Sequence, residues 1–226
     1  ERRILTSILI KTTRDRVPVI VSITHHSTEV AVRQAIEAER TGAHAIMVLP
    51  PFFLGPSMDS ILFHVEAIAG AVHIPVILQY APAQTGIDTA ILSRLPVSMM
   101  KVDASPSVPA LLALPPTVTT LVGYMGLDLP DAVSVGCSGC MPTASLVRPF
   151  VKIWRNLQSN PEEGRREHQR LIPLLQYMMQ SIEFLIAAEK HLLLKRSIIQ
   201  SSYCRKPCTL LNRDQANQLD EYVENL

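Results

Sequence analysis

The sequence predicts an α/β fold: a parallel sheet with helices between its strands, followed by a helical extension. Six short apolar runs recur within residues 18–143, and amphipathic stretches separate them. Each run is continuously apolar rather than alternating, which is typical of parallel strands that are buried on both faces. After residue 160 the pattern becomes wholly helical. Strands that alternate with helices form βαβ units, and such units build a parallel sheet.

The individual elements follow from apolar runs, capping residues and helix breakers. Ser27 and Ser57 are suited to cap helices, and Gly42 is suited to end the first of these helices. A kink or break is expected at Pro173, because proline has no backbone N–H to donate to the helical hydrogen-bond pattern. Strands are expected at residues 18–24, 44–50, 76–81, 99–103, 119–124 and 139–143. Helices are expected at residues 27–40, 57–71, 88–95, 106–114, 128–135, 145–156, 161 to about 199, and 213–224.

The composition excludes several classes of protein. The 226 residues are 47% hydrophobic and 18% charged, which is unlike a disordered chain. A formal net charge of +1 leaves no excess of basic surface for nucleic acid. The longest apolar stretch, at residues 43–55, is interrupted by Pro50 and Pro51 and is shorter than the roughly 20 residues of a membrane-spanning helix. With no segment that resembles a signal peptide, we expect a cytoplasmic protein that binds neither nucleic acid nor membrane.

The four cysteines form two closely spaced pairs. Cys137 and Cys140 are the ends of the segment C-S-G-C, and Cys204 and Cys208 are the ends of the segment C-R-K-P-C. Two such pairs could form a four-thiolate zinc site. The second spacing is unusual for zinc, however, and the first pair includes a predicted strand end. Ordinary buried thiols are the better interpretation, so no metal site is predicted.

Lys101 is the residue whose position most favours chemistry. It lies within the apolar run M-M-K-V at residues 99–102, where an ammonium group is costly unless it is paired or neutral. A buried lysine can supply a nucleophilic amine that attacks a carbonyl and forms a Schiff base. The alternative is a lysine at a strand end whose ammonium reaches solvent. Asp103 lies two residues further on and points to the same side, where it either tunes the lysine or, as we prefer, solvates the mouth of the site.

Tyr80 ends the preceding predicted strand. In parallel α/β sheets the ligand site lies at the carboxyl ends of the strands, so Tyr80 and Lys101 are expected at the same edge. A phenol in that position can relay protons to and from a reacting oxygen. A packed tyrosine whose hydroxyl has found a partner is the alternative.

Several segments, in order and with similar spacing, resemble the dihydrodipicolinate synthase/N-acetylneuraminate lyase family. They are R-V-P-V-I at 16–20, G-A at 42–43, Y-A-P-A-Q-T-G at 80–86, the strand that bears Lys101, and G-C-S-G at 136–139. Members of this family are (β/α)8 barrels that hold pyruvate or another 2-oxo acid as a Schiff base.

The resemblance implies roles for individual residues. Lys101 matches the Schiff-base lysine, and Tyr80 matches the tyrosine that shuttles protons. The loops after Gly123 and Met141 are implied to contribute to the substrate pocket, with Tyr124 among their residues.

One departure from the family concerns the start of the barrel. The family's second strand carries a Gly-Thr-Thr-Gly-Glu-like loop that holds the 2-oxo acid carboxylate, whereas residues 1–16 already resemble the helix after that strand. The resemblance therefore predicts a (β/α)8 TIM barrel that lacks its first two βα units. Residues 1–160 would supply strands 3 to 8, and residues 161–226 a C-terminal helical extension packed on the barrel.

Further departures concern the substrate. Phe52 and Phe53 lie where the synthases have a tyrosine pair, and Gln84 lies where an arginine grips the second substrate's carboxylate. Glutamine cannot form a bidentate ion pair. These departures favour the branch of the family that cleaves or dehydrates 2-keto-3-deoxy sugar acids, with Gln84 as a substrate-binding position.

The segment S-I-T-H-H-S-T at 22–28 resembles the third strand of ketodeoxy-arabonate dehydratase-like members. Thr24 and His26 are therefore expected to bind substrate, and a histidine there could act as acid or base. The alternative is that His25 and His26 face solvent in a polar helix cap.

The expected activity is that of a Schiff-base lyase, an aldolase or dehydratase that needs no cofactor and acts on pyruvate or a 2-keto-3-deoxy sugar acid. The alternatives are a dihydrodipicolinate synthase-like condensation and a non-catalytic truncated relative of the family. The resemblance further implies a homo-oligomer, a tetramer or dimer.

Overall fold

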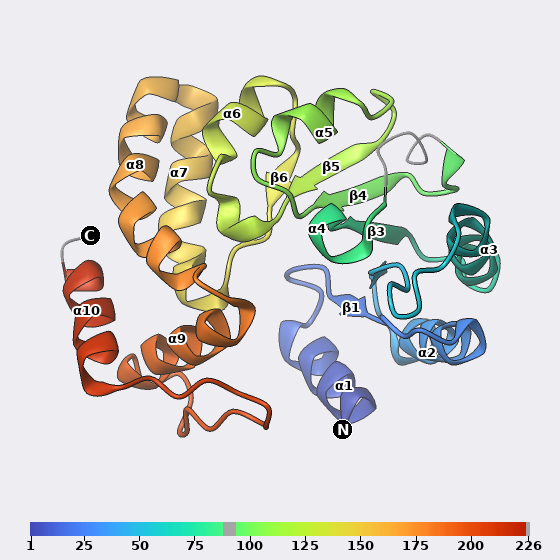
Figure 1. Ribbon diagram of the computed structural model, residues 1–226, viewed down its shortest axis with the longest axis horizontal. Coiled ribbons are helices and arrows are strands. Elements are labelled where there is room, and N and C mark those ends of the chain that lie inside the picture. The colour runs from blue at the N-terminus through green and yellow to red at the C-terminus, as the bar shows by residue number, and fades with distance from the viewer. Residues whose placement is uncertain (88–93, 225–226) are drawn as a thin grey trace. The chain divides into compact units, whose positions relative to one another are not determined.

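The computed structural model describes residues 1–87 and 94–224 (Figure 1). The chain divides into two compact units. The first comprises Glu1–Gly123 and Val135–Ser138, and the second comprises Tyr124–Ser134 and the chain from Gly139 onward. The helix expected at residues 88–95 falls largely outside the described residues.

The first unit is built on a parallel sheet, as predicted. Five strands pair in parallel and in chain order, each one next to its predecessor. The predicted strands are confirmed with narrower bounds: β1 (Ile20–Ser22), β2 (Ala45–Val48), β3 (Val76–Tyr80), β4 (Met99–Val102) and β5 (Thr119–Val122). Because parallel strands place all their carboxyl ends at one edge, the residues that follow β1, β3, β4 and β5 share that edge.

The two faces of this sheet differ in character. In register, Tyr80 lies beside Val102, and Gln79 lies beside Lys101. Successive side chains of a strand point to opposite faces, so these two pairs occupy opposite faces. Tyr80 and Val102 are buried, whereas Gln79 and Lys101 are partly exposed. The more exposed face thus carries the polar side chains.

Three helices of the first unit lie where the sequence predicts them, namely α2 (Thr28–Thr41), α3 (Met58–Ala69) and α5 (Val108–Leu112), whereas α4 (Pro82–Thr85) was not predicted. The hydroxyl of Ser27 accepts from the backbone N–H of Val30 and caps α2, which ends at Gly42 with a positive φ of 100°. Helix α2 turns the small residues Ala31 and Ala35 inward, and α3 lies beside it (Figure 1). The helices are α1 (Arg2–Thr13), α2 (Thr28–Thr41), α3 (Met58–Ala69), α4 (Pro82–Thr85) and α5 (Val108–Leu112).

The second unit is mainly helical and has its own apolar core. Helices α7 and α8 lie side by side, and their buried faces contribute Phe150, Ile153, Leu171 and Leu175 to that core (Figure 1). The elements are η2 (Tyr124–Gly126), α6 (Leu129–Ser134), β6 (Gly139–Cys140), η3 (Ala144–Leu146), α7 (Val147–Ser159), α8 (Pro161–Met178), α9 (Ile182–Lys195) and α10 (Arg213–Glu224).

Of the kink or break expected at Pro173, the break is wrong. Helix α8 continues through Pro173 to Met178, because the residues around the proline, such as Leu171 and Leu174, are buried in the core and hold both halves in place. The chain turns instead just before α9, where the hydroxyl of Ser181 accepts from the backbone N–H of Phe184. Among the described residues, no single helix is long and apolar enough to span a membrane, and α8 and α9 pass that test only as a pair bent by 118°.

Candidate active site

Lys101 lies within the central strands of the first unit. It precedes the fully buried Val102 in β4 and is in register with Gln79 of β3 and Leu121 of β5. The Lys101 side chain is only 12% exposed. A charged group at this depth is costly unless it has a partner, so its contacts determine what it can do.

Asp103 is that partner. The Lys101 Nζ donates to both carboxylate oxygens of Asp103, at 2.7 Å to Oδ1 and 2.5 Å to Oδ2. The Gln79 side-chain amide donates to Oδ2 at 2.6 Å, and the Asp103 side chain is 13% exposed. Asp103 therefore contacts the lysine directly, contrary to our preference for a carboxylate that only solvates the mouth of the site.

Gly123 leaves the space that this carboxylate occupies. A Cβ atom at position 123 would overlap the Asp103 carboxylate and would lie 2.8 Å from Lys101 Nζ. The backbone N–H of Gly123 donates to the carbonyl of Val102 at 2.8 Å, which fixes the glycine beside the end of β4. The structure thus brings Gly123, predicted as a pocket residue, together with Lys101.

The structure does not bring Tyr80 to Lys101. The register places Tyr80 beside Val102, on the face opposite to that of Lys101, and its side chain is 4% exposed. The residue of β3 that faces the lysine is Gln79, one position earlier. Sequence reasoning missed Gln79, because the face that a residue of β3 shares with Lys101 depends on the register of the two strands.

Thr24 and His26 lie in the segment that follows β1, and Gln84 lies in α4, which follows β3. The Thr24 hydroxyl accepts from the backbone N–H of Leu49 at 3.1 Å, which ties the segment after β1 to the segment after β2. His26 is exposed and packs against the ring of Phe52, with centroids 4.9 Å apart. Gln84 is exposed within α4. Their roles in substrate binding stay predictions.

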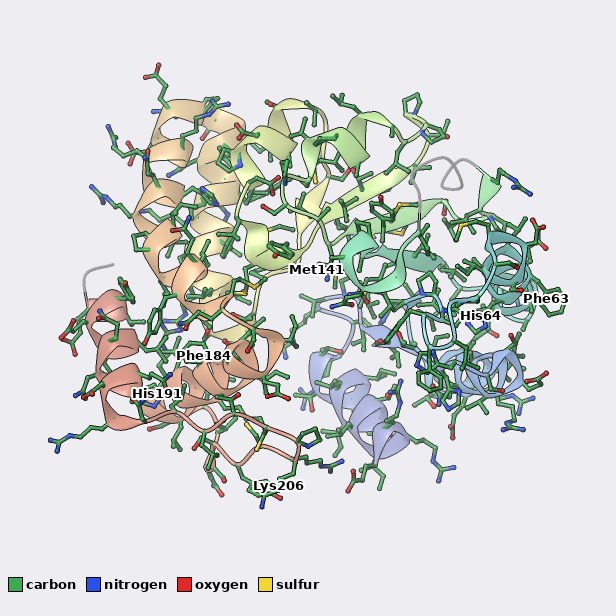
Figure 2. All side chains as sticks on the ribbon, in the orientation of Figure 1. Phe63, His64, Met141, Phe184, His191 and Lys206 are labelled. Carbon is green, nitrogen blue, oxygen red and sulfur yellow. The ribbon has the colours of Figure 1, made fainter. Side chains whose placement is uncertain are left out.

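Tyr124 and Met141 belong to the second unit and are described within it. Tyr124 has a positive φ of 49° in the turn η2, where the next residue, Met125, also has a positive φ of 58°. A left-handed backbone is uncommon for residues with a side chain. Met141 is partly buried just after β6 (Figure 2). Their place in the pocket stays a prediction.

His64 is a buried titratable group outside the site. It lies on α3 and points inward, whereas its neighbour Phe63 is exposed (Figure 2). Its Nδ1 is 2.9 Å from the hydroxyl of Thr28, and its Nε2 is buried with no hydrogen-bond partner among the described residues. Burial lowers the pKa of His64 below its ordinary value, and the charges of His26 and His25 lower it further.

His168 is the corresponding group of the second unit. Its Nε2 lies 2.7 Å from the carbonyl oxygen of Gly126, to which it donates. Burial is the main cause that lowers the pKa of His168, while the bond to Gly126 and the nearby carboxylates Asp128 and Asp131 oppose the shift.

The thiols and carboxylates form no metal-binding cluster in the described part of the chain. None of the four cysteines forms a disulfide, and Cys137 and Cys204 are buried. Across residues 1–87 and 94–224, no three side chains of His, Cys, Asp or Glu converge as metal ligands would.

Comparison with known proteins identifies the family of the chain. The model of the Dihydrodipicolinate synthetase family matches residues 1–226. The chain belongs to this family. Relatives within the dihydrodipicolinate synthetase family are named for more than one enzyme activity.

Two relatives illustrate that range. A 4-hydroxy-tetrahydrodipicolinate synthase of Thermomicrobium roseum is 30% identical over 181 residues, which cover 74% of this chain and 59% of that protein. An L-2-keto-3-deoxyarabonate dehydratase of Azospirillum brasilense is 25% identical over 237 residues, which cover 97% of this chain and 75% of that protein. The match thus spans about three fifths to three quarters of the length of these relatives.

Solved structures of the dihydrodipicolinate synthetase family share the fold. The 4-hydroxy-tetrahydrodipicolinate synthase of Methylacidiphilum fumariolicum SolV superposes with a TM-score of 0.89 at 25% identity, covering 100% of this chain and 78% of that one. A prophage protein of E. coli, solved in complex with pyruvate, superposes with a TM-score of 0.89 at 20% identity, covering 99% and 80% of the two chains. The fold agreement extends over nearly the whole of this chain.

Proposed function

We propose that the chain forms a Schiff base with a 2-oxo acid and acts as a lyase of the aldolase or dehydratase type. The observation that carries the proposal is the environment of Lys101. Its amine lies 12% exposed in a central parallel strand, next to the strand ends where ligands of parallel α/β folds bind. Membership of a family whose named members include a synthase and a dehydratase supports this class of chemistry.

The reaction needs no dissociable carrier. The Lys101 amine attacks the C2 carbonyl of the 2-oxo acid, and loss of water leaves a protonated imine. The cationic nitrogen then withdraws electrons from the neighbouring carbons. That withdrawal facilitates either cleavage of a C–C bond or loss of a hydroxyl group as water.

The substrate we propose is pyruvate or a 2-keto-3-deoxy sugar acid. The dehydratase of Azospirillum brasilense supports a sugar acid, and it aligns with 97% of this chain. The uncharged Gln84 supports the same branch, because it cannot grip a second carboxylate as an arginine would. A synthase-like condensation of a 2-oxo acid with a carboxylate-bearing aldehyde is the second candidate, favoured by the relative from Thermomicrobium roseum.

We also propose how the chain relates to a whole barrel and to its surroundings. The strands correspond to strands 3 to 8 of a (β/α)8 barrel, formed by residues 1–160, with residues 161–226 as a helical extension. Thr24 and His26 of the first unit contribute to its pocket, and a substrate-binding role for Tyr124 and Met141 stays a prediction from the sequence. We expect a cytoplasmic homo-oligomer, dimer or tetramer, and light scattering after gel filtration measures that state.

Trapping with sodium borohydride tests the proposed function directly. The protein is incubated with pyruvate or a 2-keto-3-deoxy sugar acid and reduced, and the modified peptide is located by mass spectrometry. The expected result is one adduct on Lys101 that is absent from a Lys101→Arg variant. If no 2-oxo acid yields an adduct on Lys101, the proposal fails and the non-catalytic relative is the better description.

A further inference from the structure

Asp103 holds the amine of Lys101 through two short contacts. Both carboxylate oxygens accept from Nζ, at 2.7 and 2.5 Å. Both side chains are largely buried, at 12% and 13% exposure, so bulk water does not compete freely for the pair. A carboxylate in this position is within proton-transfer distance of the nitrogen that would react.

The surroundings fix this carboxylate in place. The Gln79 amide donates to Oδ2 at 2.6 Å, from the strand on one side of β4. The backbone N–H of Asp103 donates to the carbonyl of Tyr80 at 2.7 Å, which anchors the residue to the end of β3. On the other side, Gly123 offers no side chain where the Asp103 carboxylate lies. Three neighbouring strands thus place one carboxylate against Nζ.

We propose that Asp103 is the proton-transfer group of the Lys101 site. This inference rests on the proposed function, because it concerns the steps by which the Schiff base forms. The residue of β3 that faces Lys101 is an amide, Gln79, which cannot exchange a proton with an amine at neutral pH. Asp103 contacts the reacting nitrogen, whereas Gln79 acts through Asp103 as a positioning residue.

The proposed step balances without any external acid or base. Asp103 takes one proton from the Lys101 ammonium, and the freed amine attacks C2 of the 2-oxo acid. A second proton of the nitrogen passes to the former carbonyl oxygen and gives a neutral carbinolamine. Asp103 then returns its proton to that hydroxyl group. The C–O bond breaks, water leaves, and a protonated imine remains beside the regenerated carboxylate.

The alternative role for Asp103 is a purely structural ion pair, which keeps a buried ammonium satisfied. The two roles differ in their kinetic consequences. A structural partner affects folding and affinity, whereas a proton-transfer group affects the rate of imine formation and can be replaced by a small acid of suitable pKa.

The experiment measures the rate of imine formation with pyruvate by rapid quenching into borohydride and mass spectrometry. Asp103→Asn is the near-isosteric variant, and Asp103→Ala leaves a gap that added formate or acetate can enter. The matched control is Asp220→Asn, which removes a carboxylate paired with Lys195 at 2.9 Å in the second unit. Circular dichroism and thermal unfolding verify that each variant is folded.

The expected result is that Asp103→Asn slows trapping by roughly 10²- to 10⁴-fold, the usual contribution of a positioned acid or base. Asp220→Asn is expected to trap at the wild-type rate. Formate and acetate are expected to accelerate Asp103→Ala in a saturable manner, with rates that follow the pKa of the added acid. A structural partner produces no such dependence on acid strength.

Three outcomes would overturn the inference, and they can be told apart. If wild-type protein traps pyruvate on Lys101 and folded Asp103→Asn does so at the same rate, the proposed function stands and the role of Asp103 falls. If wild-type protein forms no adduct with any 2-oxo acid, the proposed function falls and the role of Asp103 falls with it. Failure of both acids to rescue a folded Asp103→Ala variant likewise contradicts proton transfer.

Discussion

Acidification is expected to destabilise the protein through His64. The imidazole is 1% exposed and contacts the hydroxyl of Thr28, while its Nε2 has no partner among the described residues. A second proton would place a buried positive charge in that position, which the nearby carboxylate of Glu29 offsets only in part. Burial, and the charges of His26 and His25, therefore lower the pKa of His64 in the folded state.

The sign and upper limit of the effect follow from proton linkage. In the unfolded chain the pKa of this group returns to its ordinary value of 6.5. Stability from the neutral imidazole is fully present above that pH, and it is lost as the pH falls toward the lower pKa of the folded state. The loss reaches its limit of about 1.4 kcal/mol per pH unit only below pH 6.5, where the unfolded chain binds the extra proton. Over the whole interval from pH 7.5 to 5.5, His64 therefore accounts for at most about 1.4 kcal/mol.

Urea unfolding followed by circular dichroism, at half-unit steps from pH 7.5 to 5.0, measures this contribution. His168 is expected to add a loss of the same sign, since its pKa is also lowered by burial. The informative quantity is therefore the difference between wild type and His64→Asn. His73→Asn is the control for loss of a histidine, because the His73 side chain is 99% exposed.

The expected outcome is a shallower fall in the free energy of unfolding with pH for His64→Asn than for wild type or His73→Asn. The variant starts from a lower stability at pH 7.5, and the two curves approach each other as the pH falls. Parallel curves for wild type and His64→Asn across the whole range would refute the reasoning, because they would show that His64 binds its proton equally well in both states.

Three further perturbations have expected outcomes. Gly123→Ala should displace the Asp103 carboxylate, cost about 1–3 kcal/mol in urea unfolding and slow borohydride trapping; an unchanged trapping rate would contradict the geometry. Gly164→Ala should lower the thermal midpoint by several degrees in calorimetry, since its Cβ would lie 2.7 Å from the backbone nitrogen of Leu157; an unchanged midpoint would contradict the close approach of α7 and α8. Ser27→Ala should cost about 1 kcal/mol and increase hydrogen exchange at the start of α2, and equal exchange would argue against the cap.

The strands and most helices could be predicted from the sequence because local signals determine them. Continuous apolar runs located the six strands found among residues 1–87 and 94–224, and Ser27 and Gly42 marked both ends of α2. Pro173 shows the limit of such signals. Its effect on a helix depends on whether burial of neighbours such as Leu171 outweighs the missing donor, and burial is a property of the folded core.

The position of Lys101 could be predicted, but its partners could not. A lysine within an apolar run can be recognised in the sequence alone. Which residues of β3 lie on the same face as that lysine depends on strand register. A shift of one residue exchanges Tyr80 for Gln79, because neighbouring side chains of a strand point to opposite faces. Likewise, the carboxylate of Asp103 fits against Lys101 because Gly123, twenty positions later in the chain, lacks a side chain.

The pairing of Lys101 with Asp103 also explains how a largely buried strand can accommodate this chemistry. Before reaction the site holds one ammonium and one carboxylate, which together are neutral. In the proposed step the proton moves to Asp103 and leaves a neutral amine beside a neutral acid. After water departs, a cationic imine again lies beside a carboxylate. The total charge of the Lys101–Asp103 pair is zero at each of these stages, so the pair itself never leaves an unpaired charge buried in the strand.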